Sequence, residues 1–183
     1  MCIRDSHLPK DTIICDIDGT IANIGHRLHF IREHGGLKEA PDWNSFNSAC
    51  IDDPPISDII DIVKSLWVSY DINVPPTTRT LKFFTGRNNE VRKNTEEWLL
   101  RNFIGNNQVS EGRLPDLMEL GITLSMRNEN DFREDSVVKL EMMEHFELKP
   151  EDVLCIFEDR QSVVDMWRAH GYRVLQVKAC CDR

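Results

Sequence analysis

Residues 14–20 read Ile14-Cys15-Asp16-Ile17-Asp18-Gly19-Thr20, the form of a buried strand that ends in a polar turn. Parallel α/β sheets bind ligands at the carboxyl ends of their strands. Two carboxylates spaced two residues apart, Asp16 and Asp18, can there bind one hard cation and act on one phosphorus atom. The alternative is an ordinary polar turn, where Asp and Gly are common.

Four further apolar runs alternate with amphipathic stretches along the chain. Short runs that are nearly continuous in apolar residues are typical of strands buried on both faces. The alternation therefore predicts an α/β fold with a Rossmann-like parallel sheet flanked by helices. The expected strands are 12–15, 81–84, 122–126, 153–157 and 174–177, and the expected helices are 57–67, 89–102, 136–146 and 161–170, with Asp135 as a candidate N-cap.

The length of 183 residues suits one compact domain. Residues 1–11 have no periodicity and are predicted to be a disordered lead-in, of which the first six are a candidate non-native addition. Residues 12–179 are predicted to form a single domain. Within it, residues 21–70 fit the strand–helix rhythm poorly, so we expect a small cap inserted after the first strand.

Composition excludes several classes of protein. No apolar run approaches the length that spans a bilayer, and the N-terminus lacks a signal core. The six cysteines have no metal-binding or redox spacing, which indicates a reducing cytoplasm. The net charge of -9 argues against a protein that coats nucleic acid by bulk electrostatics, but it leaves room for a local pocket for one phosphate.

A second polar turn, Thr85-Gly86-Arg87, follows the run 81–84. A hydroxyl with free backbone N–H groups can cradle a phosphoryl oxygen, and the arginine adds a positive charge. The alternative is a strand-to-helix turn that the threonine caps.

Two more features carry charged residues in the second half of the chain, a lysine within a predicted helix and a charged run after the fourth strand. Lys139 falls on the apolar face of its predicted helix, which suggests an anionic partner at the sheet edge, since lysine is rarely buried alone. The alternative is a lysine whose stem covers apolar surface. Glu158, Asp159 and Arg160 end the fourth run, where a metal ligand from a neighbouring strand would be needed, although a capping turn would look the same.

The order Asp-x-Asp-Gly-Thr, Thr-Gly-Arg, Lys, Glu-Asp resembles the haloacid-dehalogenase-like phosphatases over residues 12–177. More narrowly, residues 126–176 are similar to the 3′-phosphatase domains of bacteriophage polynucleotide kinase/phosphatases. The stretches that carry this resemblance are MRNENDFREDSVVK (126–139) and EDRQSVVDMWRAHGY (158–172).

This resemblance implies a role for each matched residue. Asp16 would be the nucleophile, and Asp18 would protonate the leaving group and then activate water. Mg²⁺ would be held by Asp16, Asp159 and the backbone carbonyl of Asp18. Glu158 stands where the phage enzymes have a shorter aspartate, and we include it among the expected metal ligands. The remaining expected site residues are Thr85 and Gly86 on a phosphoryl oxygen, Lys139 offsetting its charge, and Arg87, Arg127 and Arg160 gripping the phosphate or its nucleotide.

The expected activity is removal of a terminal phosphate from a polynucleotide, at the 3′ end. The alternatives are a phosphatase of free nucleotides or other small phosphomonoesters, and an inactive relative that binds a phosphate or a protein. No Gly-x-x-x-x-Gly-Lys-Ser/Thr sequence is present, so we expect the kinase domain to be absent from this chain.

Three histidines, His26, His29 and His34, follow the first motif. His26 and His29 would share a helical face and could bind zinc, but no third ligand with the standard spacing is present, so packing or a substrate contact in the cap is favoured over zinc.

Overall fold

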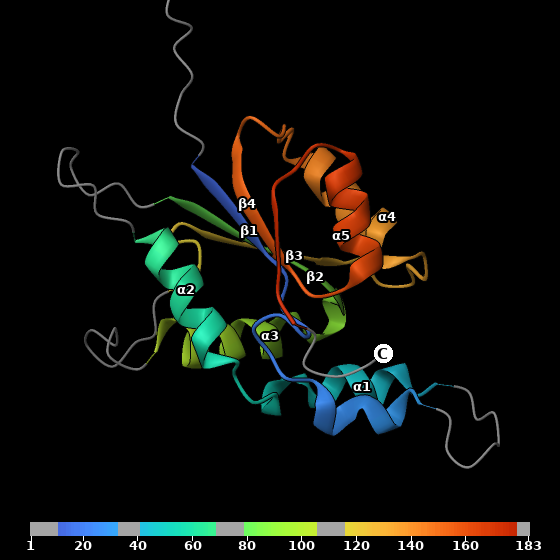
Figure 1. Cartoon of the computed structure of the whole chain (residues 1–183). Coiled ribbons are helices and arrows are strands. Elements are labelled where there is room, and N and C mark those ends of the chain that lie inside the picture. The colour runs from blue at the N-terminus through green and yellow to red at the C-terminus, as the bar shows by residue number, and fades with distance from the viewer. Residues whose placement is uncertain (1–10, 33–40, 69–78, 106–115, 179–183) are drawn as a thin grey trace, which may run out of the picture.

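The computed structural model describes residues 11–32, 41–68, 79–105 and 116–178. Its centre is a five-stranded sheet in the order β3-β2-β1-β4-β5, and every neighbouring pair is parallel (Figure 1). The predicted α/β fold is therefore confirmed. The strands are β1 (Thr12–Cys15), β2 (Thr80–Asn88), β3 (Ile122–Arg127), β4 (Val153–Glu158) and β5 (Val174–Gln176), so β2 alone runs well past its predicted end.

The helices that flank the sheet are close to those predicted. They are α2 (Ser57–Trp67), α3 (Arg92–Trp98), α4 (Asp135–His145) and α5 (Gln161–Ala169). The predicted helix 89–102 is instead three consecutive segments, a 3-10 turn η3 (Asn89–Val91), α3, and a π-helical stretch η4 (Leu99–Ile104). The prediction that Asp135 caps α4 is wrong, because Glu134 occupies the N-cap position and Asp135 is the first helical residue.

Side chains of the central strand alternate between two hydrophobic cores. Ile13 and Cys15 pack in a core that α2 and α3 cover, whereas Ile14 packs in a second core under α4 and α5. Figure 1 shows these helix pairs on opposite sides of the sheet. Burial on both faces explains why the strands are continuous apolar runs, and it leaves the strand ends as the place for polar side chains.

The chain between β1 and α2 forms a small insertion. It contains the 3-10 turns η1 (Gly25–Phe30) and η2 (Ala49–Asp52) and the short helix α1 (Trp43–Ser48), which lie below the sheet in Figure 1. Ile24, Leu28 and Phe46 form a separate cluster in this insertion. Side chains of α2 belong to the main core, so the predicted cap of residues 21–70 includes a helix of the main body.

Several predictions lie partly or wholly outside the described residues. The predicted lead-in is one of them, apart from Asp11, whose carbonyl accepts a hydrogen bond from the Thr80 amide.

In the described ranges, no helix combines the length and the apolar character needed to cross a membrane. Cys15, Cys50 and Cys155 are buried free thiols.

Two buried tryptophans provide a matched test of how the insertion is attached. The Trp98 indole donates to the carbonyl of Asp53, just after η2, at 2.7 Å, whereas the Trp167 indole finds no acceptor among the described residues. Both substitutions to Phe remove similar area, but only Trp98→Phe strands a buried carbonyl. Urea unfolding should show that Trp98→Phe lowers the free energy of unfolding by about 1–2 kcal/mol more than Trp167→Phe. Equal losses would contradict this account.

Candidate active site

The turn after β1 carries Asp16 and Asp18. The Asp16 amide still pairs with β4 through a hydrogen bond of 3.0 Å, and the Ile17 carbonyl then accepts the amides of residues 20–22. Gly19 has a φ of 94°, a left-handed conformation that glycine adopts without a steric penalty. This tight turn fixes both carboxylates at the carboxyl end of the central strand, which is their predicted position.

The buried ammonium of Lys139 joins the ends of β1 and β4. Its Nζ lies 2.6 Å from Asp16 Oδ1 and 2.8 Å from Glu158 Oε2. The second oxygen of Asp16 accepts from the Thr20 hydroxyl at 3.0 Å, and that hydroxyl lies 3.5 Å from Asp159 Oδ1. Lys139 is 1% exposed, so its position on the apolar face of the helix indicates a buried anionic partner, as expected.

Burial raises the pKa of Asp16 to about 7, and the neighbouring Glu158 adds to this effect although Lys139 opposes it. Burial likewise raises the pKa of Glu158. For Lys139, burial favours the neutral amine, but Asp16 and Glu158 outweigh it and raise the pKa of the ammonium. The single positive charge of Lys139 therefore does not fully compensate the negative charges of the neighbouring carboxylates.

Asp16, Glu158 and Asp159 also form a candidate metal centre. One carboxylate oxygen from each of the three lies within 4.8 Å of the others. When all three are ionised, one ammonium leaves a formal charge of about -2 on the group, which a divalent cation balances. Carboxylate oxygens are the ligands that Mg²⁺ prefers, so the donor set fits this ion. The contribution of the Asp18 carbonyl remains a prediction.

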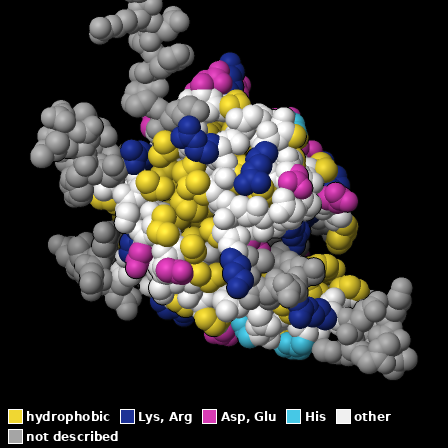
Figure 2. All heavy atoms as spheres, viewed as in Figure 1, with side chains coloured by type: hydrophobic (Ala, Val, Ile, Leu, Met, Phe, Trp, Pro, Cys, Tyr) yellow, Lys and Arg dark blue, Asp and Glu magenta, His cyan; other side chains and the backbone are white. Residues whose placement is uncertain are grey.

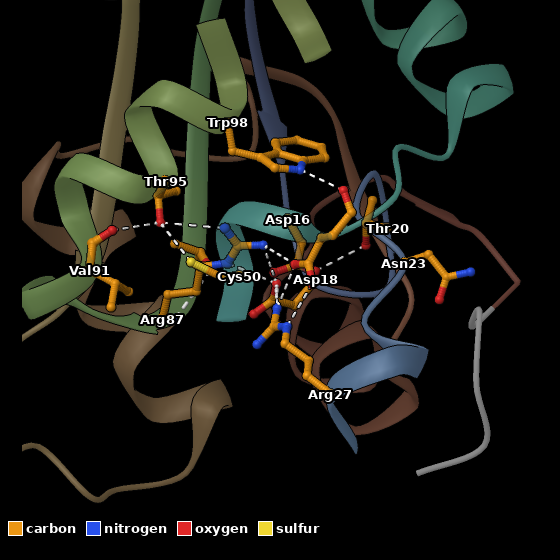
Figure 3. Close-up of polar contacts among 12 residues, drawn as sticks. Asp16, Asp18, Thr20, Asn23, Arg27, Cys50, Arg87, Val91, Thr95 and Trp98 are labelled. Atoms are coloured by element: carbon orange, nitrogen blue, oxygen red, sulfur yellow. Dashed lines mark hydrogen bonds and ion pairs between the residues drawn. The ribbon is translucent and has the colours of Figure 1, made fainter. Parts of the chain in front are cut away.

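Asp18 is held by a second buried network, which the sequence analysis missed. Its Oδ1 accepts hydrogen bonds from Arg27 Nη2 at 2.7 Å and from Arg87 Nε and Nη2 at 2.8 and 2.7 Å (Figure 3). Both guanidinium groups also contact Asp53 Oδ2 at 2.7 Å. The side chains of Arg27, Arg87 and Asp53 are 0% exposed. The network thus ties Asp18, the insertion and β2 into one unit.

Thr85, Gly86 and Arg87 belong to strand β2 (Thr80–Asn88), so the prediction of a polar turn at these residues is wrong, and Thr85 and Arg87 are buried. Arg87 lies behind Asp18 with its guanidinium held by carboxylates, so the structure favours a positioning role for it over a direct grip on substrate. The Thr85 hydroxyl oxygen is buried and accepts from the Arg87 amide at 3.2 Å. Gly86 lines the cavity described below.

Asp135 connects the two arginines expected to hold the substrate. Its carboxylate lies 3.0 Å from Arg127 and 3.5 Å from Arg160. The pKa of Asp135 is lowered, because Lys139, Arg160 and Arg127 outweigh the effect of burial. Arg127 donates in addition to the carbonyls of Gly86 and of residues 131 and 133. These contacts favour a structural role for Arg127 over the predicted contact with substrate, whereas the Arg160 side chain, 39% exposed, is better placed to meet a ligand.

The histidines do not form a metal site in the described residues. His26 Nε2 lies 2.9 Å from Asp53 Oδ1, and His29 Nδ1 lies 2.9 Å from the His26 carbonyl. Figure 2 shows histidine side chains at the lower edge of the molecule, over η1. His34 lies outside the described residues. The contact of His26 with Asp53 agrees with packing as its role.

The metal-compatible cluster and Asp18 face the same cavity, which has a volume of about 370 Å³. Asp16, Asp18, Glu158 and Asp159 line it together with residues of the insertion and of the loop between β3 and α4. The volume falls within the range of small-molecule sites. Four acids, three buried cations (Lys139, Arg27 and Arg87) and a metal-compatible cluster at the ends of parallel strands are suited to phosphoryl transfer.

The chain was compared with known families and structures. Residues 10–180 match the family model described as the polynucleotide kinase PNKP phosphatase domain. The chain belongs to this family. It is thus a haloacid-dehalogenase-like phosphatase, as the sequence resemblance implied. No curated protein gave a match.

Solved structures agree on the fold. A chain in the Pnkp1/Rnl/Hen1 RNA repair complex is 24% identical with a TM-score of 0.63, and the match covers 97% of this chain and 45% of that one. The chain thus spans about half the length of this neighbour. A haloacid dehalogenase-like hydrolase from Streptococcus pneumoniae is 14% identical with a TM-score of 0.54, over 91% and 83% of the two chains.

Gly86 tests how closely β2 must approach α4. A Cβ on Gly86 would lie 2.3 Å from Asp135 Oδ1, and Asp135 is held by its three cationic neighbours. Gly86→Ala should therefore displace this carboxylate and lower kcat/KM roughly tenfold or more, with a loss of about 1–3 kcal/mol in the free energy of unfolding.

Gly25→Ala is the control for this substitution, because the nearest atom to its added Cβ is an oxygen of the Asn23 side chain at 3.1 Å. Kinetics and urea unfolding of both variants measure the difference. Wild-type activity in Gly86→Ala would mean that the approach to Asp135 is not required.

Proposed function

We propose that this phosphatase removes the 3′-phosphate from polynucleotide ends, with Asp16 as the nucleophile and Mg²⁺ as the cofactor. The observation that carries the proposal is the Asp16 carboxylate, held between Lys139 and Thr20 at the floor of the cavity. The family match supports the substrate class. The structural neighbours support the fold alone.

Asp16 must attack a phosphate ester that carries the same sign of charge. Two negative charges about 4 Å apart repel each other strongly when water is excluded. The Lys139 ammonium, 2.6 Å from Asp16, offsets part of this repulsion and holds the carboxylate in place. In the proposed first step, an Asp16 oxygen forms a bond to phosphorus and the bond from phosphorus to the 3′-oxygen breaks, which gives an aspartyl-phosphate.

The proposed metal ligands are Asp16, Glu158 and Asp159, which lie close enough to share one ion. Bound there, Mg²⁺ would supply positive charge to the phosphoryl oxygens. Glu158 also contacts Lys139, which limits its freedom to turn away from the cluster.

Asp18 would be the general acid and base. It would donate a proton to the departing 3′-oxygen and then accept one from the water that hydrolyses the aspartyl-phosphate. Arg27 and Arg87 fix its carboxylate from the side of the insertion and of β2. We therefore propose that both arginines, together with Asp53, position Asp18 rather than touch the substrate.

Two alternatives remain open to test. A phosphatase of free nucleotides would use the same chemistry, and the net charge of -9 suits a small substrate as well. An inactive relative is disfavoured, since Asp16, Asp18, Lys139 and Asp159 are all retained. The buried free thiols suit the cytoplasm as the proposed compartment.

A substrate panel discriminates these possibilities. Phosphate release should be measured from an oligonucleotide with a 3′-phosphate, from the same oligonucleotide with a 5′-phosphate, and from 3′-mononucleotides. The proposal predicts the highest kcat/KM for the 3′-phosphorylated oligonucleotide. Preference for mononucleotides would replace it with the first alternative, and no release from any of them would favour the second.

Replacing the nucleophile should abolish turnover without unfolding the protein. Asp16→Asn keeps the side-chain volume but removes the charge that attacks phosphorus, so kcat should fall by about 10³-fold or more. Asp61→Asn, on the exposed side of α2, is the matched control and should keep full activity. More than a trace of activity in folded Asp16→Asn would exclude Asp16 as the nucleophile.

Metal exchange provides an independent prediction. Mg²⁺ should restore activity to chelator-treated protein, and Ca²⁺ should compete with it and inhibit, because Ca²⁺ takes more ligands at longer distances and would misplace Asp16. Steady-state assays with both ions check this. Full activity in excess chelator would rule out the metal.

A further inference from the structure

Two large aromatic side chains are exposed at the catalytic cavity. Trp43 is 52% exposed and Phe132 is 88% exposed, yet both line the same cavity as Asp16. They come from separate parts of the fold, α1 of the insertion and the loop between β3 and α4, which Figure 1 shows on the same side of the molecule. Exposed apolar side chains that gather at one site indicate binding more often than scattered ones.

Packing against a buried ring orients the indole of Trp43. Its ring meets the ring of Phe46 edge-to-face, with centroids 5.7 Å apart and an angle of 87° between the planes. Phe46 also contacts the guanidinium of Arg27, which lies 4.2 Å from the ring centroid. The same guanidinium holds Asp18. Trp43 is therefore linked to the proposed general acid by three contacts in series, through Phe46 and Arg27.

Phe132 is displayed on a loop that is fixed on both sides of it. Arg127 Nη1 donates to the carbonyls of Asp131 at 3.2 Å and of Arg133 at 2.6 Å, the residues that flank Phe132. The Asp131 carboxylate accepts from the Arg133 amide at 3.1 Å, and Arg133 also pairs with Glu141 on α4. A loop held this firmly does not expose its phenylalanine through lack of order.

We propose that Trp43 and Phe132 stack on the nucleobase next to the scissile phosphate, so that the enzyme selects an unpaired terminal nucleotide. This inference rests on the proposed function. Every base has two π faces, and aromatic side chains bind them without reading sequence. A base inside a duplex has both faces covered by its neighbours, so it cannot make these contacts.

Size and charge also favour a single base over a longer footprint. A cavity of about 370 Å³ has room for one nucleotide but not for a base pair. On the face drawn in Figure 2, cationic and anionic side chains are interspersed without a continuous basic band. With a net charge of -9, the protein gains little affinity for a polynucleotide from contacts along the phosphate backbone. Stacking of the terminal base next to the catalytic carboxylates would supply affinity that these contacts do not.

The test compares two single-stranded oligonucleotides with a 3′-phosphate, which differ only in the last nucleotide. One ends in a normal nucleoside and the other in a tetrahydrofuran abasic analogue. The proteins are wild type, Trp43→Ala, Phe132→Ala and the rescue variant Trp43→Phe. Met118→Ala is the control, since Met118 is 82% exposed in the turn before β3.

Wild type should prefer the base-bearing end, and each alanine variant should lower kcat/KM on that end by roughly 5- to 150-fold, the range for loss of one stacking contact. Activity on the abasic end should change less than threefold, Trp43→Phe should recover most of the loss, and Met118→Ala should match wild type. A blunt duplex end should react more slowly than the single strand. A 3′-mononucleotide should share the dependence on Trp43, because it carries the same base.

Equal losses on both ends, or no loss on either, would overturn the stacking proposal and leave the proposed function intact. Unchanged kinetics in both alanine variants would assign the aromatic pair to some other partner, such as a protein, and would likewise overturn it. If wild type released no phosphate from either oligonucleotide, the proposed function itself would fail.

Discussion

The Lys139 ammonium, 2.6 Å from Asp16 and 2.8 Å from Glu158, is the contact on which the site depends. Burying these charges is costly, and an apolar substitute would often be at least as stable. Burial raises the pKa values of Asp16 and Glu158, and the neighbouring carboxylates, which outnumber the one ammonium, add to this effect. A site of this kind carries excess negative charge when its three carboxylates are ionised, and a divalent cation would balance that charge. Stability therefore does not explain it, whereas phosphoryl transfer does.

The second network places the insertion at the site. Arg27 and Asp53 come from the insertion, Arg87 from β2, and all three meet Asp18 or one another within 2.7–2.8 Å. Removing one partner would leave a buried charge uncompensated, so the network forms or fails as a unit. The insertion is thus attached through the residues that hold the proposed general acid. Its outer face in turn presents Trp43 to the cavity.

The sequence predicted the features that depend on local pattern. Strands buried on both faces are continuous apolar runs, and their polar ends mark Asp16, Asp18, Glu158 and Asp159. It did not predict Arg27 and Asp53, because they lie 26 residues apart in a region without periodicity, and only the folded insertion brings them together. The sequence predicts a helix cap at Asp135, since a cap and an inward-facing acid in the first turn have the same sequence signature. It predicts a substrate contact for Arg127, because nothing in the sequence reveals that loop carbonyls accept its hydrogen bonds.

The central claim is that Asp16 becomes covalently phosphorylated. Wild-type enzyme mixed with an oligonucleotide that carries a labelled 3′-phosphate, then quenched in acid within milliseconds, tests this claim most directly. The account predicts label on the protein, in the peptide that contains Asp16, in a form that is stable to acid and lost in alkali, and no label on Asp16→Asn. Phosphate release at the full rate without any labelled protein at the earliest times, or label that persists in Asp16→Asn, would contradict it.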